Sequence, residues 1–414
     1  MKIVTLTPQQ FDRFGANHKY RNYYQTSSYG SLMTKFGYNI HYLGIVSDTN
    51  KLIGATLILY RQVFMNNKIA YAPRGILFNY ENIEILEEAI KKLKQVLNKQ
   101  GFMLLRIDPY IPLTIRDSKG TIMNFNNQGN KIIDNLKAIG FNYKGKNILF
   151  DTEKPRWEGL VILGEDTEKL FNKFEKRTRN KIRRALNFGI EVSKDTTKNI
   201  DKLYEFIKDT TKKPSQYYQQ LCDKYGENAE VYYAKLNTET FTINSRRAYE
   251  NELENNNILA NMIQDQSIDE KQKNNILNKK MESDKLLDTY KQSLVRATNL
   301  LKKFPNGIII GGALSIKFDN AAFIVVEGIN QKHKSHNPDY VIKWKMIQDY
   351  TKENLKYLNL GGVIGEFEKQ TEHNISNEKI LGFNTTITEY IGEFDIVLNN
   401  FAYNLYKSFA KNKK

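Results

Sequence analysis

Six basic side chains gather in the segment EKRTRNKIRRALNFGIEV, residues 175–192, which also holds only two acidic residues. They are Lys176, Arg177, Arg179, Lys181, Arg183 and Arg184. Like charges three or four residues apart repel on a helix, so a helix that only faces water usually mixes its signs. Clustered Lys and Arg side chains bind phosphate oxygens without reading base identity. We therefore expect a polyanionic partner here, with a merely solvated helix face as the alternative.

The apolar residues of the same segment give the predicted helix an inward face. Ile182, Ala185 and Leu186 fall on one side of a 3.6-residue period and leave the charges on the rim. Gly189 stands where a helix C-cap requires a positive φ, directly before the predicted strand IEV.

The whole chain of 414 residues carries a net charge of +16. An excess of this size favours phosphate-bearing partners and anionic membrane surfaces, although a basic composition that only aids solubility is the alternative. Cys222 is the single cysteine, so no internal disulfide is possible and a reducing compartment fits. No run approaches the roughly 20 apolar residues that span a bilayer, and we expect a cytoplasmic protein.

Common catalytic and cofactor motifs are missing from the sequence. Five histidines and one cysteine are too scattered for a convincing metal set, so we expect no metal. His333 and His336 have no nearby carboxylate pair and are interpreted as part of a surface loop. Neither a G-x-G-x-x-G turn nor a P-loop lysine motif is present, which leaves nucleotide-driven chemistry unsupported. Cys222 lacks the context of a nucleophile and is expected to be a buried helical thiol.

Hydrophobic patterning predicts two similar series of strands and helices. The first has strands at 39–46, 52–64, 68–76, 102–110 and 147–151, with helices at 81–100 and 128–138. The second has helices near 167–187, 199–210, 215–225 and 337–353, with strands at 229–237, 307–318, 321–329 and 356–363. We expect two related α/β halves, residues 1–153 and 154–395, whose identity is too low to establish a repeat.

An inserted segment, residues 245–303, contains no proline and no glycine. Apolar residues at seven-residue spacing, with others between them, predict one seam of a coiled coil; they are Leu287, Tyr290, Leu294, Ala297 and Leu301. The expected partner positions, across a turn at 264–272, are Leu253, Ile258 and Met262. The sparse apolar positions favour an antiparallel arm in solvent over a pair of ordinary core helices.

The C-terminal segment, residues 396–414, is predicted to be a helix that joins the first half. Phe401, Leu405 and Phe409 recur every four residues and should pack on the body. The lysines expected to remain in water are Lys407, Lys411, Lys413 and Lys414.

The basic segment reads R-x-x-x-R-R/K-A-x-x-x-G-I/V-x-V and resembles the signature of the Fem (FemABX) family of aminoacyl-tRNA-dependent peptidyltransferases. Other stretches agree in the same order: YYQTSSYGSL, YAPRGILFNYEN, LLRIDPYIP, YYQQL, DYVIKWKMIQDY, YLNLGGVIGEF and GFNTTITEYIGEF. Each match is weak alone, but they are collinear over nearly the whole chain. The helical insertion also stands where the longer family members have one.

The resemblance implies an α/β fold of two tandem acetyltransferase-like (GNAT) subdomains with mixed sheets, and a coiled-coil arm that helps to hold tRNA. It implies transfer of an amino acid from aminoacyl-tRNA to the stem-peptide amine of a lipid- or UDP-linked muropeptide, which builds the interpeptide bridge of peptidoglycan. The six basic residues of the 176–184 cluster would bind the tRNA. No coenzyme A is expected, because the turns at 72–82 and 330–340 lack the glycine-rich sequence that holds its pyrophosphate. Peripheral association with the inner membrane face, and pairing with an identical or related chain, remain open.

Catalytic roles carry over from the family to two positions. Asp108 in RIDPY matches a position that lines the acceptor cleft, with an aspartate that caps the following turn as the alternative. Lys379 corresponds to a lysine that contacts the oxyanion, but it stands one residue early. On a strand this shift would turn the side chain to the opposite face.

Substrate-binding roles carry over with further departures. Lys35 stands two residues after Met33, which aligns with a family lysine for the acceptor phosphates, and Lys212 replaces a family arginine. The expected substrate-binding set is Lys35, Arg74, Lys212, Tyr217 and Tyr218. The chemistry would be aminolysis of an activated ester, which needs a free amine, a place for its proton and a donor to the oxyanion. A transferase with re-sited lysines is the leading hypothesis; a catalytically impaired binding protein or partner subunit, and a general RNA-binding protein, are the alternatives.

Overall fold

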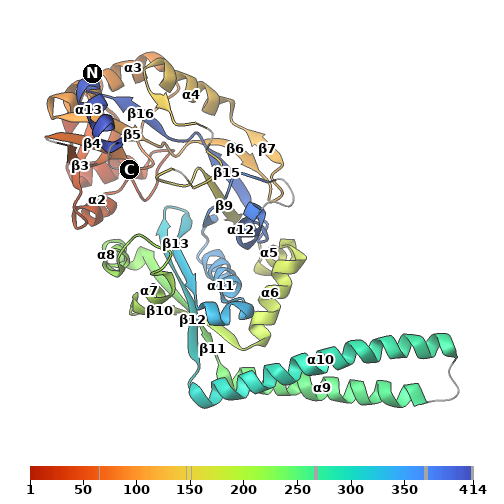
Figure 1. Ribbon diagram of the computed structural model, residues 1–414. Helices are drawn as coiled ribbons and strands as arrows, with labels where there is room; N and C mark the ends of the chain where they lie inside the picture. The colour runs from red at the N-terminus through yellow and green to blue at the C-terminus, as the bar shows by residue number, and fades with distance from the viewer. Residues whose placement is uncertain (65, 146, 151, 265–268, 368–371, 412–414) are drawn as a thin grey trace.

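The computed structural model describes residues 1–414 except 65, 146, 151, 265–268, 368–371 and 412–414. Two mixed β-sheets form the body, and a long helical arm leaves its lower half (Figure 1). Each half contains three antiparallel strands, then a helix, then a fourth strand parallel to the third. In the first half these are β2 (Asn39–Val46), β3 (Leu52–Phe64), β4 (Asn67–Ala72), α3 (Ile83–Lys99) and β5 (Phe102–Ile107); in the second, β11 (Ala229–Leu236), β12 (Ile308–Phe318), β13 (Ala321–Ile329), α11 (Pro338–Lys352) and β14 (Tyr357–Gly362).

The first sheet has the order β1-β2-β3-β4-β5-β16-β8. Its other strands are β1 (Lys2–Thr5), β8 (Asn142–Tyr143) and β16 (Phe394–Val397), and helices α1 (Pro8–Ala16), α2 (Ser27–Thr34) and α4 (Asn127–Ala138) lie beside it. On α3 the buried residues recur with the helical period, as Leu86, Ala89, Ile90, Leu93 and Leu97. This stripe packs in the core that covers one face of the sheet.

The second sheet has the order β10-β11-β12-β13-β14-β9-β15-β6-β7. Its remaining strands are β6 (Pro112–Arg116), β7 (Ile122–Phe125), β9 (Trp157–Ile162), β10 (Ile190–Asp195) and β15 (Thr386–Tyr390). The helices of this part are α5 (Thr167–Lys173), α6 (Lys176–Asn187), α7 (Asp201–Ile207), α8 (Ser215–Tyr225) and α12 (Glu372–Leu381), with the short 3-10 helices η1 (Gly226–Asn228) and η2 (Gln331–His336). Strands β6 and β7 join the second sheet and β16 joins the first, so the sheets exchange strands across the predicted division at residue 153.

One of the buried hydrophobic clusters is shared by the two halves. Side chains of α2, β2 and β3 in the first half lie in the same buried cluster as side chains of α7, α8, β11 and β12 in the second. Helices α2 and α8 contact each other directly. Apolar burial of this kind is the main favourable term in folding, and it fixes the halves against each other.

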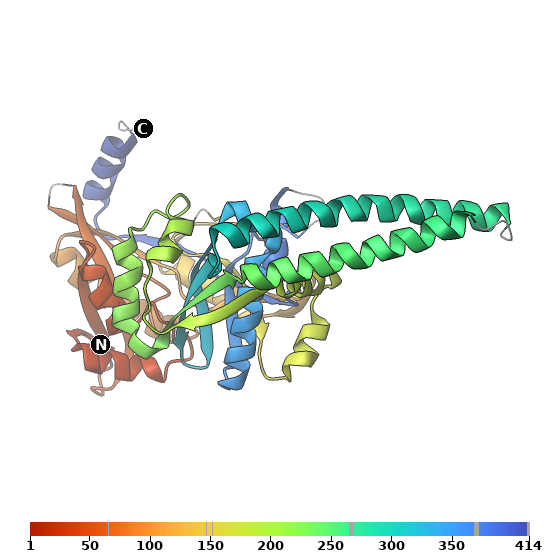
Figure 2. The ribbon, with the colours of Figure 1, turned by 90° about the horizontal axis from the view of Figure 1, so that it is seen from below.

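The predicted antiparallel arm is confirmed as α9 (Thr238–Gln264) and α10 (Glu270–Lys303), inserted between β11 and β12. Figure 2 shows it as a slender pair of helices that runs away from the body. Ala297 is fully buried on the predicted seam of α10. The partner positions on α9 were predicted wrongly, because Leu253, Ile258 and Met262 are 37%, 48% and 48% exposed.

Buried polar side chains explain why the seam positions on α9 were predicted wrongly. Asn256 is buried on α9, where its amide donates to Ser283 over 3.1 Å and to Asp284 over 2.8 Å. Leu259 is the buried apolar residue nearby, at 9% exposure. A polar residue inside a helical pair can set the register, but apolar spacing alone does not reveal it.

Two other element predictions require correction. Residues 147–150 form no strand, and residue 151 lies outside the described residues. At the C-terminus the helix α13 runs over Asn400–Lys411, so residues 396 and 397 belong to β16. Its packed side chains are Ala402, Tyr403 and Tyr406 against β5, while Phe401 and Phe409 are 79% and 50% exposed. Lys407 is exposed as expected; Lys413 and Lys414 lie outside the described residues, as does the side chain of Lys411.

No helix in the described part of the chain is long and apolar enough to cross a membrane.

Candidate functional site

A buried ion pair between the two halves holds the turn that follows β4. The guanidinium of Arg74 donates to Glu158 on β9 over 2.6 Å and to the carbonyl of Pro155 over 2.8 Å. The side chains of Arg74 and Glu158 are 3% and 11% exposed. Tyr110 and Tyr390 stack on each other, with ring centroids 4.5 Å apart, and both rings lie next to the guanidinium. The predicted contact of Arg74 with a substrate would therefore require this ion pair to open.

Asp108 follows β5 and is buried beside that turn. Its carboxylate accepts the backbone N–H of Arg74 over 2.6 Å and the hydroxyl of Tyr71 over 3.0 Å. These bonds fix the turn after β4. The alternative interpretation of Asp108 was that its side chain caps the turn that follows it in the sequence. Burial raises the pKa of Asp108 to about 6, against the effect of Arg74.

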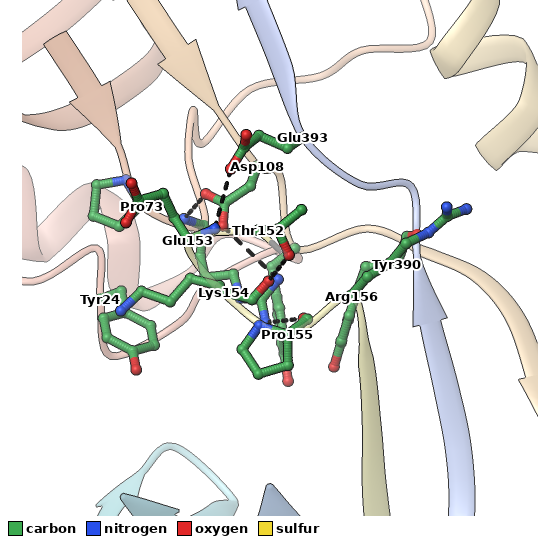
Figure 3. A network of polar contacts seen from close by, with 12 residues as sticks. Tyr24, Pro73, Asp108, Thr152, Glu153, Lys154, Pro155, Arg156, Tyr390 and Glu393 are labelled. Carbon is green, nitrogen blue, oxygen red and sulfur yellow. Dashed lines mark hydrogen bonds and ion pairs between the residues drawn. The ribbon is translucent and has the colours of Figure 1, made fainter. Parts of the chain in front are cut away.

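A second carboxyl group with a raised pKa belongs to the same polar network. Burial raises the pKa of Glu393 to about 7, and the nearby Arg106 acts in the opposite direction. Figure 3 shows Glu393 and Asp108 close together above the linker residues 152–156. A carboxyl group that titrates near neutral pH is suited to accept a proton from an attacking amine.

A group of cations and tyrosines lies where this linker meets α8 and the loop before α2. We name Tyr24, Arg61, Lys154, Lys213 and Tyr217 the basic–tyrosine cluster. The side chain of Lys154 reaches the ring of Tyr24 (Figure 3), and its ammonium lies 3.7 Å from the ring centroid. The ammonium of Lys213 lies 5.1 Å from the ring centroid of Tyr217. Burial, Lys154 and Arg61 together lower the pKa of Lys213. The cations therefore lie close enough to repel, and a bound anion would relieve that repulsion.

Tyr217 of the predicted substrate-binding set belongs to this cluster, and two other members of the set, Tyr218 and Lys35, adjoin it. Tyr217 and Tyr218 are buried on α8, and Tyr217 packs against Phe36 with ring centroids 5.3 Å apart. Lys35 is exposed at the end of α2 and donates to Gln220 of α8 over 2.6 Å. Arg74 lies apart in its ion pair.

Lys212 was predicted to bind substrate, but its neighbour Lys213 was not. Both lysines are exposed, but Lys213 lies over the ring of Tyr217. The run of two lysines before Pro214 was the available signal, but periodicity does not say which of two adjacent loop residues faces a tyrosine. Lys154 and Arg61 were missed as well, because only the fold brings the linker and β3 to α8.

Lys379 lies on the helix α12, so the strand geometry considered for it does not apply. On a helix a shift of one residue rotates the side chain by about 100°. Its ammonium pairs with Asp339 of α11 over 3.1 Å, and its side chain is 43% exposed. Burial alone would lower the pKa of Lys379, but Asp339 raises it above the ordinary value. Lys379 is therefore a protonated donor near the surface of the second half.

The basic helix α6 presents most of its charge to solvent. Lys176, Arg177, Arg183 and Arg184 are exposed, and Arg179 and Lys181 are half-buried. Lys181 donates to the hydroxyl of Tyr340 over 2.7 Å and to Glu378 over 2.9 Å, and Arg177 also pairs with Glu378.

The inward face of α6 agrees with the sequence in part. Ile182 and Ala185 are fully buried, but Leu186 is 46% exposed, so its predicted inward position was wrong. Gly189 has a φ of +78°, which confirms the predicted end of the helix.

Two predictions about residues outside these clusters have different outcomes. Cys222 is a buried thiol on α8, as expected. His333 and His336 do not form a surface loop; they lie on η2 with their rings 5.5 Å apart, and His333 is buried.

The repeated strand order and the parallel strand pair in each half place the chain in the class of tandem GNAT-fold proteins. The profile of the FemAB family matches residues 6–411, and the chain belongs to this family. It is 24% identical over 430 residues to the aminoacyltransferase FemA of Staphylococcus epidermidis, with 100% of both chains covered. It is also 24% identical over 418 residues to the lipid II:glycine glycyltransferase of the same species, with 98% of this chain and 95% of the relative covered.

The crystal structure of FemX has the same fold. Its TM-score against this chain is 0.71 at 21% identity, with 98% of this chain and 99% of the FemX chain covered. The predicted fold class is thereby confirmed. The family match and the named relatives identify the chain as an enzyme, an aminoacyltransferase.

Proposed function

We propose that this enzyme moves an amino acid from an aminoacyl-tRNA to the stem-peptide amine of a lipid-linked peptidoglycan precursor. The main support is membership of the FemAB family over residues 6–411. The relative named as a lipid II:glycine glycyltransferase favours a lipid-linked acceptor. Both substrates carry phosphate, and the chain has two separate basic surfaces, the helix α6 and the basic–tyrosine cluster.

The basic–tyrosine cluster is the proposed site for the acceptor pyrophosphate. Lys154 and Lys213 lie over tyrosine rings, and the lowered pKa of Lys213 reflects burial and the nearby Lys154 and Arg61. A diphosphate would neutralise these charges through charge-assisted hydrogen bonds, which are stronger than neutral ones. Lys35, on the neighbouring α2, extends the same surface.

The proposed reaction is aminolysis of the aminoacyl ester. The acceptor nitrogen bonds to the carbonyl carbon, the bond from that carbon to the tRNA ribose oxygen breaks, and the amine loses a proton while the ribose hydroxyl gains one. Lys379, kept protonated by Asp339, is the proposed donor to the developing oxyanion. Asp108 is the proposed carboxyl group for the proton of the amine, since its pKa of about 6 keeps it ionised at neutral pH.

The first experiment incubates the protein with charged tRNAs and either a lipid-linked or a UDP-linked precursor, and measures the product mass. The mass increase identifies the amino acid and the number added. An increase on the lipid-linked precursor is the expected result. Binding of both substrates without a product under any donor would refute the proposal.

A second experiment tests Lys379. Lys379→Ala should lower kcat by a factor of about 100 or more, the usual cost of losing an oxyanion donor. Lys345→Ala is the matched control, because Lys345 also pairs with an aspartate of α11, Asp349, at 2.6 Å. Equal rates for the two variants would refute the role of Lys379.

A third experiment separates Lys213 from Lys212. Lys213→Ala should raise KM for the precursor about tenfold or more, because a hydrogen bond to a charged group contributes about 1.5–3 kcal/mol. Lys212→Ala should change KM little. The reverse order would move the phosphate site to Lys212 and contradict the assignment.

A further inference from the structure

A cavity of about 1120 Å³ lies at the root of the arm. It is enclosed by the end of α6, the first turns of α9, the last turns of α10 and the 3-10 helix η2. Figure 1 shows α9 and α10 leaving the body at this point. Five cationic side chains line the cavity: Arg184, Arg247, Arg296, Lys303 and Lys332. Among the described residues that line the cavity, none is Asp or Glu.

These five cations are not neutralised within the part of the chain that the structure describes. None of them has a carboxylate within 4.0 Å there, in contrast to Arg177 and Lys181 nearer the start of α6, which both pair with Glu378. Burial, His333 and the cationic Arg184 and Arg296 lower the pKa of His336 to about 4. The positive field therefore reaches into the wall of the cavity, and an anion there would be bound favourably.

The remaining wall offers rings and amides. Phe188, Phe241 and His336 pack against one another with ring centroids 5.0–5.4 Å apart, and Tyr290 faces the cavity from α10. Amide side chains also line it, namely Asn187, Asn244, Asn251 and Asn299. The buried Nδ1 of His333 has no hydrogen-bond partner among the described residues. Cations together with an aromatic ring on which a base can stack are typical of sites that bind single-stranded nucleic acid.

We propose that this cavity binds nucleotide units of a single-stranded RNA segment, with the cations on the phosphates and Tyr290 beside a base. The assignment rests on the proposed function, in which the donor is an RNA. The volume exceeds the roughly 300–1,000 Å³ of most small-molecule sites, which favours several linked nucleotides over one free nucleotide. An acidic peptide would satisfy the cations but would leave the ring of Tyr290 without a base to stack on.

The farther part of α9 contrasts with its root. Beyond Arg247 this helix carries Glu250, Glu252 and Glu254, and no further basic residue before it ends at Gln264. Carboxylates at these positions disfavour phosphates on the farther part of α9, whereas the farther part of α10 carries lysines, among them Lys271, Lys273 and Lys279. On α9, the RNA should therefore contact the root of the helix and not its farther part.

Adjacent residues in the chain supply matched variants for the test. Arg247 and Lys303 line the cavity, whereas their neighbours Arg246 and Lys302 do not. The double variant Arg247→Gln/Lys303→Gln is compared with Arg246→Gln/Lys302→Gln. All four side chains lie on the surface of the arm, and both variants remove two positive charges. Binding is followed by fluorescence anisotropy of a labelled single-stranded oligoribonucleotide of about 12 nucleotides over a series of salt concentrations.

The cavity variant should bind the oligoribonucleotide at least tenfold more weakly than the wild type. The slope of log K against log salt should fall by about 1.4, since each lost phosphate contact on a single strand contributes about 0.7. The control variant should remain within about twofold of the wild type. Equal weakening by the two variants, or binding of ATP with no binding of the oligoribonucleotide, would overturn the proposal.

The transfer assay distinguishes failure of this inference from failure of the proposed function. With an active enzyme, the cavity variant should raise KM for aminoacyl-tRNA and leave KM for the precursor unchanged. If the wild type transfers nothing but the two variants still differ in RNA binding, the proposed function fails and the RNA cavity stands. If transfer occurs and the two variants bind RNA equally, only the cavity assignment fails.

Discussion

Loss of the carboxylate of Glu158 should destabilise the protein far more than loss of an exposed one. Glu158 lies 2.6 Å from the guanidinium of Arg74, and their side chains are 11% and 3% exposed. At this distance and an effective dielectric constant of about 20, their attraction is about 6 kcal/mol. In Glu158→Ala the buried guanidinium would keep the carbonyl of Pro155, but its nearest carboxylate would be Asp108 at 4.0 Å. Breaking a buried pair in this way costs about 3–5 kcal/mol.

The matched control is the ion pair of Lys173 and Glu165. Its distance is also 2.6 Å, but its side chains are 49% and 44% exposed. Exposed pairs contribute about 0–1 kcal/mol, so Glu165→Ala should lower the free energy of unfolding by no more than that. Because the two distances are equal, the comparison isolates the effect of burial.

Urea titration followed by circular dichroism measures both free energies of unfolding. Glu158→Gln separates charge from hydrogen bonding, because glutamine can still accept hydrogen bonds from Asn359 and Tyr390, which donate to Glu158 over 2.7 and 3.1 Å. Its cost should lie between those of Glu158→Ala and Glu165→Ala. Equal losses for Glu158→Ala and Glu165→Ala would refute the argument from burial.

Three further predictions follow from single buried groups. Cys222 is 2% exposed and burial raises the pKa of its thiol to about 12, so an aromatic disulfide reagent at pH 8 should modify it only after unfolding in urea; rapid modification of the native protein would contradict this. Burial raises the pKa of Glu393 from 4.5 to about 7, and the stability linked to this group is complete below about pH 4.5 and is lost as the pH rises through about 7. The urea midpoint should therefore fall less between pH 5 and pH 8 in Glu393→Gln than in the wild type, and an equal fall would count against the shift. A side chain at Gly382 would collide with the hydroxyl oxygen of Thr178 on α6, so Gly382→Ala should cost about 1–3 kcal/mol, and an unchanged melting temperature would show that the helices can move apart.

The sequence predicted the elements of the fold where burial alone determines the pattern. The strands at 39–46, 52–64 and 321–329 have the predicted ends, because each is an apolar run bounded by turn residues. Predictions failed where polar side chains face inward, as Asn256 does in the arm. They failed also where a small residue packs, since Ala402, and not Phe401, contacts the body on α13.

The candidate site was harder to predict because its residues come from separate elements. Arg61, Lys154 and Lys213 belong to β3, the linker and the loop before α8, and the electrostatic contacts among them appear only when the halves are packed together. Glu158 lies inside an apolar strand, where nothing in its neighbours marks it as the partner of Arg74. Family resemblance supplied Asp108 and Lys379 as candidates, and their catalytic roles stay predictions. It did not supply the pairing of Lys379 with Asp339.

The buried ion pairs and the proposed phosphate site are connected through three consecutive linker residues. Arg74 holds the carbonyl of Pro155, and Arg156 pairs with Glu389 at 2.7 Å with a side chain that is 1% exposed. Lys154, which lies over Tyr24, directly precedes them. Its position is therefore fixed by two buried arginines, so Glu158→Ala should raise KM for the precursor as well as lower stability. The stability loss without any change in KM would mean that the linker keeps its place through Arg156 alone.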